Sequence, residues 1–197
     1  MTFSRCLNKR VHATRGDIAV NYSGMNMLKA SSAQDREGEA FRRAMRELAG
    51  GVSVVATGAG QDRTGCTVTS FCSLSVDPPS VLVCLNHGSS TLKAMRANGA
   101  FGVSQLSANH HEVAKVFSDA KLYGAARFEW GDWRNLITGS PLLSDALAVI
   151  DCQLEDVIER HTHAIIIGRV VAVGNHEQDA ALVHWRGRFE TLGASRV

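Results

Sequence analysis

The chain has 197 residues, 45% of them hydrophobic and 20% charged, a composition that fits a globular domain and excludes a disordered chain. Its formal net charge of +2 comes without a clustered basic run, so we do not expect nucleic acid as a partner. No apolar stretch approaches the roughly 20 residues that span a bilayer, and the five cysteines contain no C-x-x-C pair. We therefore expect a cytoplasmic protein with reduced thiols and with no membrane segment, disulfide framework or thiolate zinc site.

Residues 1–34 are expected to form an irregular, disordered leader, and residues 35–197 a single domain. The leader contains Arg5, Lys9 and Arg10 but no apolar core of the kind that secretory signals carry. Met25 and Met27 both precede the expected domain. A start codon placed too far upstream is therefore one explanation for the leader.

The domain is expected to begin with a helix that Asp35 caps and that Gly50-Gly51 ends, because Phe41, Met45 and Leu48 recur at helical spacing. This amphipathic helix should pack on another surface. Short apolar and β-branched runs then predict strands over residues 52–57, 66–76, 81–85, 100–106, 146–157 and 164–173. Short helices are predicted over residues 90–98, ended by Gly99, and over residues 109–117. Strands that follow one another without long helices favour an antiparallel barrel over a parallel sheet.

Two weaker motifs have simpler interpretations. Gly58-Ala59-Gly60 follows a strand as a dinucleotide-binding loop does, but Arg63 stands at the third glycine position, so a hairpin turn is expected. Glu159, His161 and His163 alternate along an expected strand, which would place all three on one face as a metal site requires. We assign them to a polar rim or to substrate contacts and expect no metal, although a flavin-free metal-binding barrel stays open as a third alternative.

Residues 64–79 form the most distinctive segment, in which small hydroxyl residues alternate with apolar ones up to an Asp-Pro-Pro corner. A strand of this kind can pack one face in the core while the other offers hydroxyls and an approachable backbone. Such a surface suits a flat ring with polar edges. A Thr/Ser-rich edge strand without a ligand is the alternative.

This segment, read as T-G-x-T-V-x-S-F-x-S-L-S-x-D-P-P, resembles the flavin reductase family of short-chain NAD(P)H:flavin oxidoreductases. The similarity continues through Leu85-Asn86, Ser89-x-Thr91, Arg127-Phe128 and Gly139-x-Pro141-Leu142. It ends with His161-Thr162-His163-x-Ile165-x-x-Gly168-x-Val170 and Arg186-Gly187-x-Phe189, so it covers residues 38–192 in the family's order. The resemblance implies a mainly β fold with short helices, namely the antiparallel Greek-key split β-barrel that binds FMN.

The function that the resemblance implies is the reduction of FMN or FAD by NADH or NADPH on a homodimer. Reduced flavin would then diffuse to a separate flavin-dependent monooxygenase that acts on a small aromatic substrate. A flavin-retaining electron carrier or redox sensor built on the same barrel is the alternative.

Site residues are also implied by the resemblance, one motif at a time. The residues expected along the flavin and its ring are Thr67, Val68, Thr69, Ser70, Ser73, Leu74 and Ser75. Asn86, Ser89 and Thr91 would hold a phosphate at a strand end and a helix start. Arg127 and Phe128 would lie near the flavin, although a loop arginine beside a packed phenylalanine has the same pattern. His163 would face the ring where nicotinamide stacks, unless it is an ordinary histidine at a strand end.

The sequence departs from the family pattern at three places. His87 and Gly88 replace a basic-polar pair, so the way in which the phosphate or adenylate end is held is in doubt. His184 stands where a tyrosine is usual, so the nucleotide preference does not follow from the sequence. The leader has no counterpart in the family.

Overall fold

The computed structural model describes residues 33–177 and 180–193, and most of the expected leader lies outside these residues. The chain divides into two compact units, Met1–Gly38 and Glu39–Val197. Helix α1 (Ala33–Arg46) crosses from the first unit into the second. No helix in the described ranges is both long enough and apolar enough to span a membrane.

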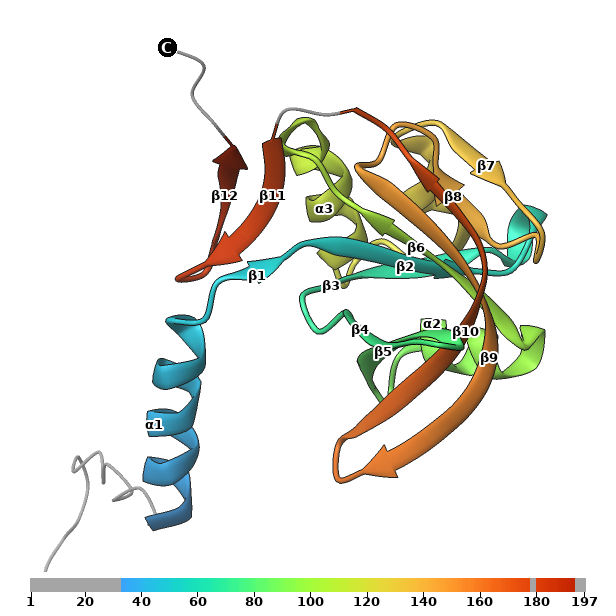
Figure 1. The fold of residues 1–197 in the computed structure, drawn as a ribbon. Helices are drawn as coiled ribbons and strands as arrows, with labels where there is room; N and C mark the ends of the chain where they lie inside the picture. The colour runs from blue at the N-terminus through green and yellow to red at the C-terminus, as the bar shows by residue number, and fades with distance from the viewer. Residues whose placement is uncertain (1–32, 178–179, 194–197) are drawn as a thin grey trace, which may run out of the picture. The chain divides into compact units, whose positions relative to one another are not determined.

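A seven-stranded antiparallel sheet is the main feature of the second unit, with the strand order β3-β2-β6-β9-β10-β5-β4 (Figure 1). Its strands are β2 (Ser53–Thr57), β3 (Thr64–Val68), β4 (Cys72–Val76), β5 (Pro79–Asn86), β6 (Ala100–Gln105), β9 (Ala148–Arg160) and β10 (His163–Asn175). The central strands β2 and β6 are buried along almost their whole length. This sheet confirms the mainly antiparallel β fold that the sequence predicts.

The two edge strands of this sheet, β3 and β4, are consecutive in the chain and are joined only by residues 69–71. In a flat seven-stranded sheet the edges would lie about 29 Å apart, because neighbouring strands are spaced by about 4.8 Å. Three linking residues span at most about 14 Å. The sheet must therefore curl until its edges approach each other, as Figure 1 shows, and the split of the barrel lies between β3 and β4.

The remaining strands form two smaller sheets. One has the order β1-β11-β12, formed by β1 (Gly50–Gly51), β11 (Ala180–Trp185) and β12 (Arg188–Gly193), and the other pairs β7 (Trp133–Asn135) with β8 (Pro141–Leu143). Leu182 N donates to Leu106 O and Val52 N donates to Leu182 O, so β11 is hydrogen-bonded to the segments that continue β6 and β2. The β1-β11-β12 sheet is thus joined to the barrel close to the β3–β4 split.

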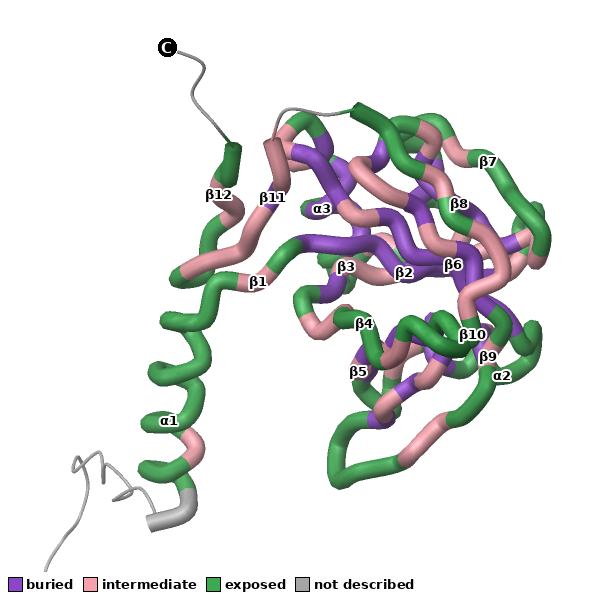
Figure 2. The backbone as a smooth tube through the Cα atoms, viewed as in Figure 1, coloured by how far each residue is buried: buried purple, intermediate pink, exposed green. Residues whose placement is uncertain are grey.

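Two helices cover two parts of the hydrophobic core, whose buried residues are purple in Figure 2. Helix α2 (Ser90–Asn98) contributes Leu92 and Met95 to a cluster with Phe101 and Ile166. Helix α3 (His111–Ser118) contributes Phe117 to a second cluster. Short 3₁₀ turns cover Gly60–Asp62, Ala108–His110 and Gly124–Glu129.

Several element predictions are confirmed. Helix α2 has the predicted bounds, and Gly99 ends it in the left-handed region with φ of 65°. Gly58 lies in the connection between the antiparallel strands β2 and β3, with φ of 83°, so the hairpin interpretation holds.

Other element predictions are wrong. The single strand over residues 66–76 is two strands, because β3 and β4 belong to opposite edges of the sheet. Asp35 lies in the first turn of α1 and does not precede it, and the helix ends at Arg46, before Gly50-Gly51 enter a sheet as β1. The strands β7, β8, β11 and β12 were not predicted.

Candidate flavin site

Strand β3 presents the side chains of the hydroxyl motif in two directions. Thr67 Oγ1 donates a hydrogen bond of 2.8 Å to Ala114 O, which attaches helix α3 to this edge of the sheet. Val68 is buried in the core cluster beneath α2. Thr69 is exposed and lies in the connection between the edges. Of these three side chains, that of Thr69 is exposed, that of Thr67 is half-buried and that of Val68 is buried.

Ser70 bridges the split of the barrel. Its Oγ donates to Cys84 O at 3.0 Å and accepts from Cys84 N at 3.1 Å, so the side chain replaces a strand partner for β5. Phe71 next to it is half-buried and packs on the core, as expected from the sequence. The hydroxyl of Ser70 therefore has a structural role that the sequence did not reveal.

The remaining motif residues lie on β4, the exposed edge strand. Ser73 and Leu74 are exposed, Leu74 by 49%. Ser75 Oγ accepts from Asp77 N at 3.2 Å and lies 3.1 Å from Asp77 O, so it shapes the turn that leads into β5. Ser73 and Leu74 thus keep surfaces free for a ligand.

Asn86, Ser89 and Thr91 come together where β5 ends and α2 begins. Asn86 Oδ1 accepts from Gly88 N at 2.8 Å, and Asn86 O accepts from Ser89 N at 3.0 Å, which folds the connection into a tight turn. Ser89 is the N-cap residue of α2, but its side chain makes no capping hydrogen bond. The backbone N–H groups of the first turn of α2 therefore stay available to an anion.

Cys66 joins this group, which the sequence analysis did not anticipate. Burial raises the pKa of the Cys66 thiol, and hydrogen bonding to Thr91, the charge of Arg127 and hydrogen bonding to Ser89 counter part of the effect. Thr91 Oγ1 is buried without a hydrogen bond of ordinary geometry, and the Cys66 thiol is the polar group beside it. The thiol is therefore a neutral neighbour of the two hydroxyls.

Arg127 is held by backbone carbonyls. Its Nε donates to Leu122 O and its Nη2 to Asp119 O, both at 2.8 Å, and its Nη1 donates to Gly65 O. Burial lowers the pKa of Arg127, although the charges of Cys66 and Asp119 act in the opposite direction. Arg127 thus links the segment around residues 119–122 to β3. Its effect on the Cys66 thiol is electrostatic.

Phe128 is a core residue, 4% exposed. Its ring meets the rings of Phe117 and Trp133 edge to face, with centroids 5.0 Å and 4.9 Å away. The guanidinium of Arg63 lies 4.7 Å from the Phe128 centroid on another side. The structure therefore surrounds Phe128 with protein groups.

His163 begins β10 directly opposite Asn86 of β5, so the two side chains lie on one face of the sheet. His163 is exposed, and its Nδ1 lies 2.8 Å from Thr162 Oγ1. His87 N donates to Thr162 O, which ties the hairpin tip to the turn that precedes α2. The candidate catalytic histidine thus lies next to the candidate phosphate clamp, which consists of Asn86, Ser89 and Thr91.

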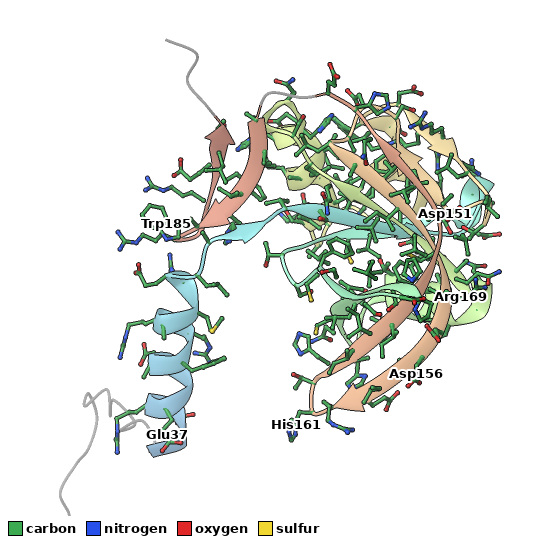
Figure 3. The ribbon with its side chains drawn as sticks, viewed as in Figure 1. Glu37, Asp151, Asp156, His161, Arg169 and Trp185 are labelled. Carbon is green, nitrogen blue, oxygen red and sulfur yellow. The ribbon has the colours of Figure 1, made fainter. Side chains whose placement is uncertain are left out.

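The expected alignment of Glu159, His161 and His163 on one strand face is wrong. Figure 3 labels His161 at the tip of the β9–β10 hairpin, where its φ is 50°, so the three residues do not share a strand. Glu159 lies opposite Ala164, whereas His163 lies opposite Arg160 and faces the other way. Glu159 is instead paired with Arg96 of α2. In the described ranges, no three His, Cys, Asp or Glu side chains gather in a way that could hold a metal ion.

Two cavities meet at Thr69 and His184. One, of about 380 Å³, is lined by Thr67, Val68, Thr69, Ser118, His184, Gly187 and Phe189. The other, of about 490 Å³, is lined by Phe41, Arg42, Met45, Arg46, Leu48, Gly50, Thr69 and His184. A side chain at Gly50 would place its Cβ 3.1 Å from Thr69 Cβ, so glycine allows β1 to approach the motif closely. The β11–β12 hairpin therefore forms one wall of the space beside the hydroxyl motif.

The fold and this site define an antiparallel split-barrel protein in which a Thr/Ser-rich strand edge lies close to a helix N-terminus. Residues 45–193 match the family described as flavin reductase like domain. The chain is 38% identical over 152 residues to the FMN reductase (NADH) RutF of Agrobacterium fabrum, which covers 77% of this chain and 87% of that protein.

Solved structures agree with the family match. BorF, the flavin reductase component of a bacterial two-component tryptophan halogenase, has a TM-score of 0.74 and 31% identity, covering 80% of this chain and 99% of that chain. The NADH:FAD oxidoreductase SgcE6 of Streptomyces globisporus C-1027, in complex with NAD and FAD fragments, has a TM-score of 0.75 and 27% identity, covering 85% and 100%. The chain belongs to the flavin reductase family and is an NAD(P)H:flavin oxidoreductase.

Proposed function

We propose that the chain reduces FMN with NADH and releases the reduced flavin to a separate monooxygenase that acts on a small aromatic substrate. FMN and NADH are chosen because the curated relative at 38% identity is an FMN reductase that uses NADH. The handover to a partner is chosen because BorF is the flavin reductase component of a two-component enzyme, in that case a tryptophan halogenase. FAD and NADPH are the alternatives within the same chemistry. We place the reaction in the cytoplasm, where the free thiols of Cys66, Cys72, Cys84 and Cys152 stay reduced.

The observation that carries the proposal is the clamp at the start of α2. A flavin phosphate there would meet the free N–H groups of the first helical turn and the hydroxyl of Ser89. The buried Thr91 hydroxyl, which lacks a hydrogen bond of ordinary geometry, would complete the clamp. The residues present therefore fit a phosphate, and Arg127 supports the clamp through the Gly65 carbonyl and through its charge.

The ring would extend from the clamp along the backbone of Thr67, Val68, Thr69 and Ser70 towards Ser73 and Leu74. When both cofactors are bound, they supply the chemistry, which is transfer of a hydride from the reduced nicotinamide to the oxidised flavin, with a further proton from solvent. The chain needs no base for this step. Its residues would bind and orient the cofactors and exclude water, and His163, opposite Asn86, would orient the nicotinamide against the ring.

We infer that the enzyme is a homodimer. The face of β5, β10 and β9 that carries His163 also carries half-buried Leu82, Ile158, Ile165 and Ile167, as the register of these strands requires. A second copy would bury this apolar face and enclose the site beside it. Ile165→Glu should shift the mass measured by light scattering after size exclusion from dimer to monomer. A wild-type monomer would contradict the inference.

The clamp is tested by measuring the flavin Kd of Ser89→Ala/Thr91→Ala. We expect a weaker Kd, by about 1 kcal/mol for each hydrogen bond lost. Ser90→Ala, which changes the neighbouring exposed hydroxyl, is the matched control. An unchanged Kd for both FMN and FAD would move the phosphate to another part of the site.

Steady-state oxidation of NADH and NADPH with each flavin then assigns the cofactor pair. Tightly retained flavin with negligible turnover would favour an electron carrier.

A further inference from the structure

The cavity of about 380 Å³ has two chemically different walls. Thr67, Val68 and Thr69 of the hydroxyl motif form one wall, and His184 and Phe189 from the β11–β12 hairpin contribute to the lining. His184 and Phe189 are direct cross-strand neighbours, so both side chains lie on the same face of the hairpin. A cavity between hydroxyls and aromatic rings is suited to a flat heteroaromatic ligand.

Phe189 fixes the position of His184 within this wall. The two ring centroids are 5.7 Å apart with an interplanar angle of 69°, an edge-to-face contact. His111 packs on Phe189 in the same manner, with centroids 5.3 Å apart and an angle of 83°. The two histidines differ in one respect that matters, because His184 lines both cavities beside Thr69 whereas His111 lines neither.

We propose that His184 is a positioning residue for the isoalloxazine ring and that its protonation makes the affinity of the chain for flavin depend on pH. This inference rests on the proposed function. Histidine is the side chain whose charge ordinarily changes near neutral pH. The edge of the flavin ring offers several carbonyl and ring-nitrogen acceptors but a single N–H donor. An imidazolium, which donates from both nitrogens, therefore matches that edge better than a neutral imidazole.

Charged groups around His184 come from two directions. From α1, Arg42 and Arg46 line the cavity of about 490 Å³ together with His184 and oppose a second positive charge there. Beyond Phe189, His111 lies against Glu112, with 3.4 Å between Nδ1 and Oε1. A bound ring would lie between His184 and the hydroxyl wall, where no charged side chain lines the cavity of about 380 Å³.

The charged residues of β12 point away from His184. Arg188 lies opposite Trp185 and Glu190 lies opposite Val183, each one position from the pair formed by His184 and Phe189. Side chains alternate between the two faces of a strand. Gly50 of β1, the other cross-strand neighbour of His184, has no side chain. His184 is therefore the titratable group of this wall that faces the ring.

Riboflavin is the probe, because it carries the ring without a phosphate that titrates in the same range. Its Kd is measured by fluorescence quenching for the wild type, His184→Phe and His111→Ala, with the melting temperature of each protein as a folding control. Between about pH 8 and about pH 5.5, the wild type should gain about fivefold to tenfold in affinity, as expected when a neutral hydrogen bond becomes charge-assisted. His184→Phe should lose this dependence, and His111→Ala should keep it.

Two results would overturn the inference. Either His184→Phe keeps the pH dependence of the wild type, or His111→Ala removes it to the same extent, which would assign the effect to the packing of Phe189. A wild type that binds flavin with one affinity at both pH values also refutes the inference and leaves the proposed function intact. A folded wild type that binds neither riboflavin nor FMN would instead refute the proposed function.

Discussion

Arg127→Met should destabilise the fold more than it weakens flavin binding, because the guanidinium is committed to protein carbonyls. Three charge-assisted hydrogen bonds, to Leu122 O, Asp119 O and Gly65 O, are lost in this variant. At about 1.5–3 kcal/mol each, the gross loss is large, but removal of a desolvated cation offsets part of it. We expect the free energy of unfolding to fall by about 3–4 kcal/mol.

The measurement is thermal unfolding followed by circular dichroism. A loss of this size should lower the melting temperature by roughly 6–16 °C, at about 2–4 °C per kcal/mol for a domain of this length. Arg63→Met is the matched control, since Arg63 is an arginine that stacks on Phe128 but makes no hydrogen bond to the carbonyls that hold Arg127. It should cost less than about 1 kcal/mol. An Arg127→Met protein that melts like the wild type yet has lost flavin would refute this reasoning and make Arg127 a ligand contact.

Two further predictions concern a histidine and a cysteine. His163→Ala should lower kcat/KM for NADH by roughly tenfold to a hundredfold while the flavin Kd stays nearly constant. Anaerobic stopped-flow reduction measures the hydride step, with His161→Ala as the control. A variant that loses flavin but is still reduced fast would show that His163 contacts the flavin and not the nicotinamide. Burial raises the pKa of the Cys152 thiol to about 12. The same thiol ionises at a lower pH in the unfolded chain, so its contribution to the free energy of unfolding should be lost as pH rises from about 9 towards 12. Chemical denaturation of Cys152→Ala should show a weaker decline than the wild type over that range, and parallel curves would contradict the assignment.

The sequence was informative where local pattern decides the structure. Gly99 ends α2 as predicted because only a residue tolerant of positive φ suits that position. The break at residues 69–71 was not visible, because Thr69 and Ser70 continue the hydroxyl pattern of the strand before them. That break depends on the hydrogen bonds between Ser70 of the connection and Cys84 of β5, which are 14 residues apart in the chain.

For the candidate site, the sequence predicts which residues come together at the start of α2 but not how the other side chains are oriented. Asn86, Ser89 and Thr91 are gathered by local turn chemistry, which the sequence reveals. Arg127 has the residue type of a ligand contact, but its partners are carbonyls that approach only in the folded chain. Cys66 carried no signal of its own, because its place beside the clamp follows from the packing of α2 against β3.

The three-residue connection between β3 and β4 also constrains the length of the chain there. The β2–β3 and β4–β5 hairpins are each local in sequence, yet β6, β9 and β10 all lie between them in the sheet. One extra residue in the connection would have to loop out, because the registers of β3 and β4 are fixed by their partner strands β2 and β5. Ser70 would also lose its register with Cys84. Evolution and protein engineering can therefore exchange residue types in this segment, but insertions and deletions belong in other loops.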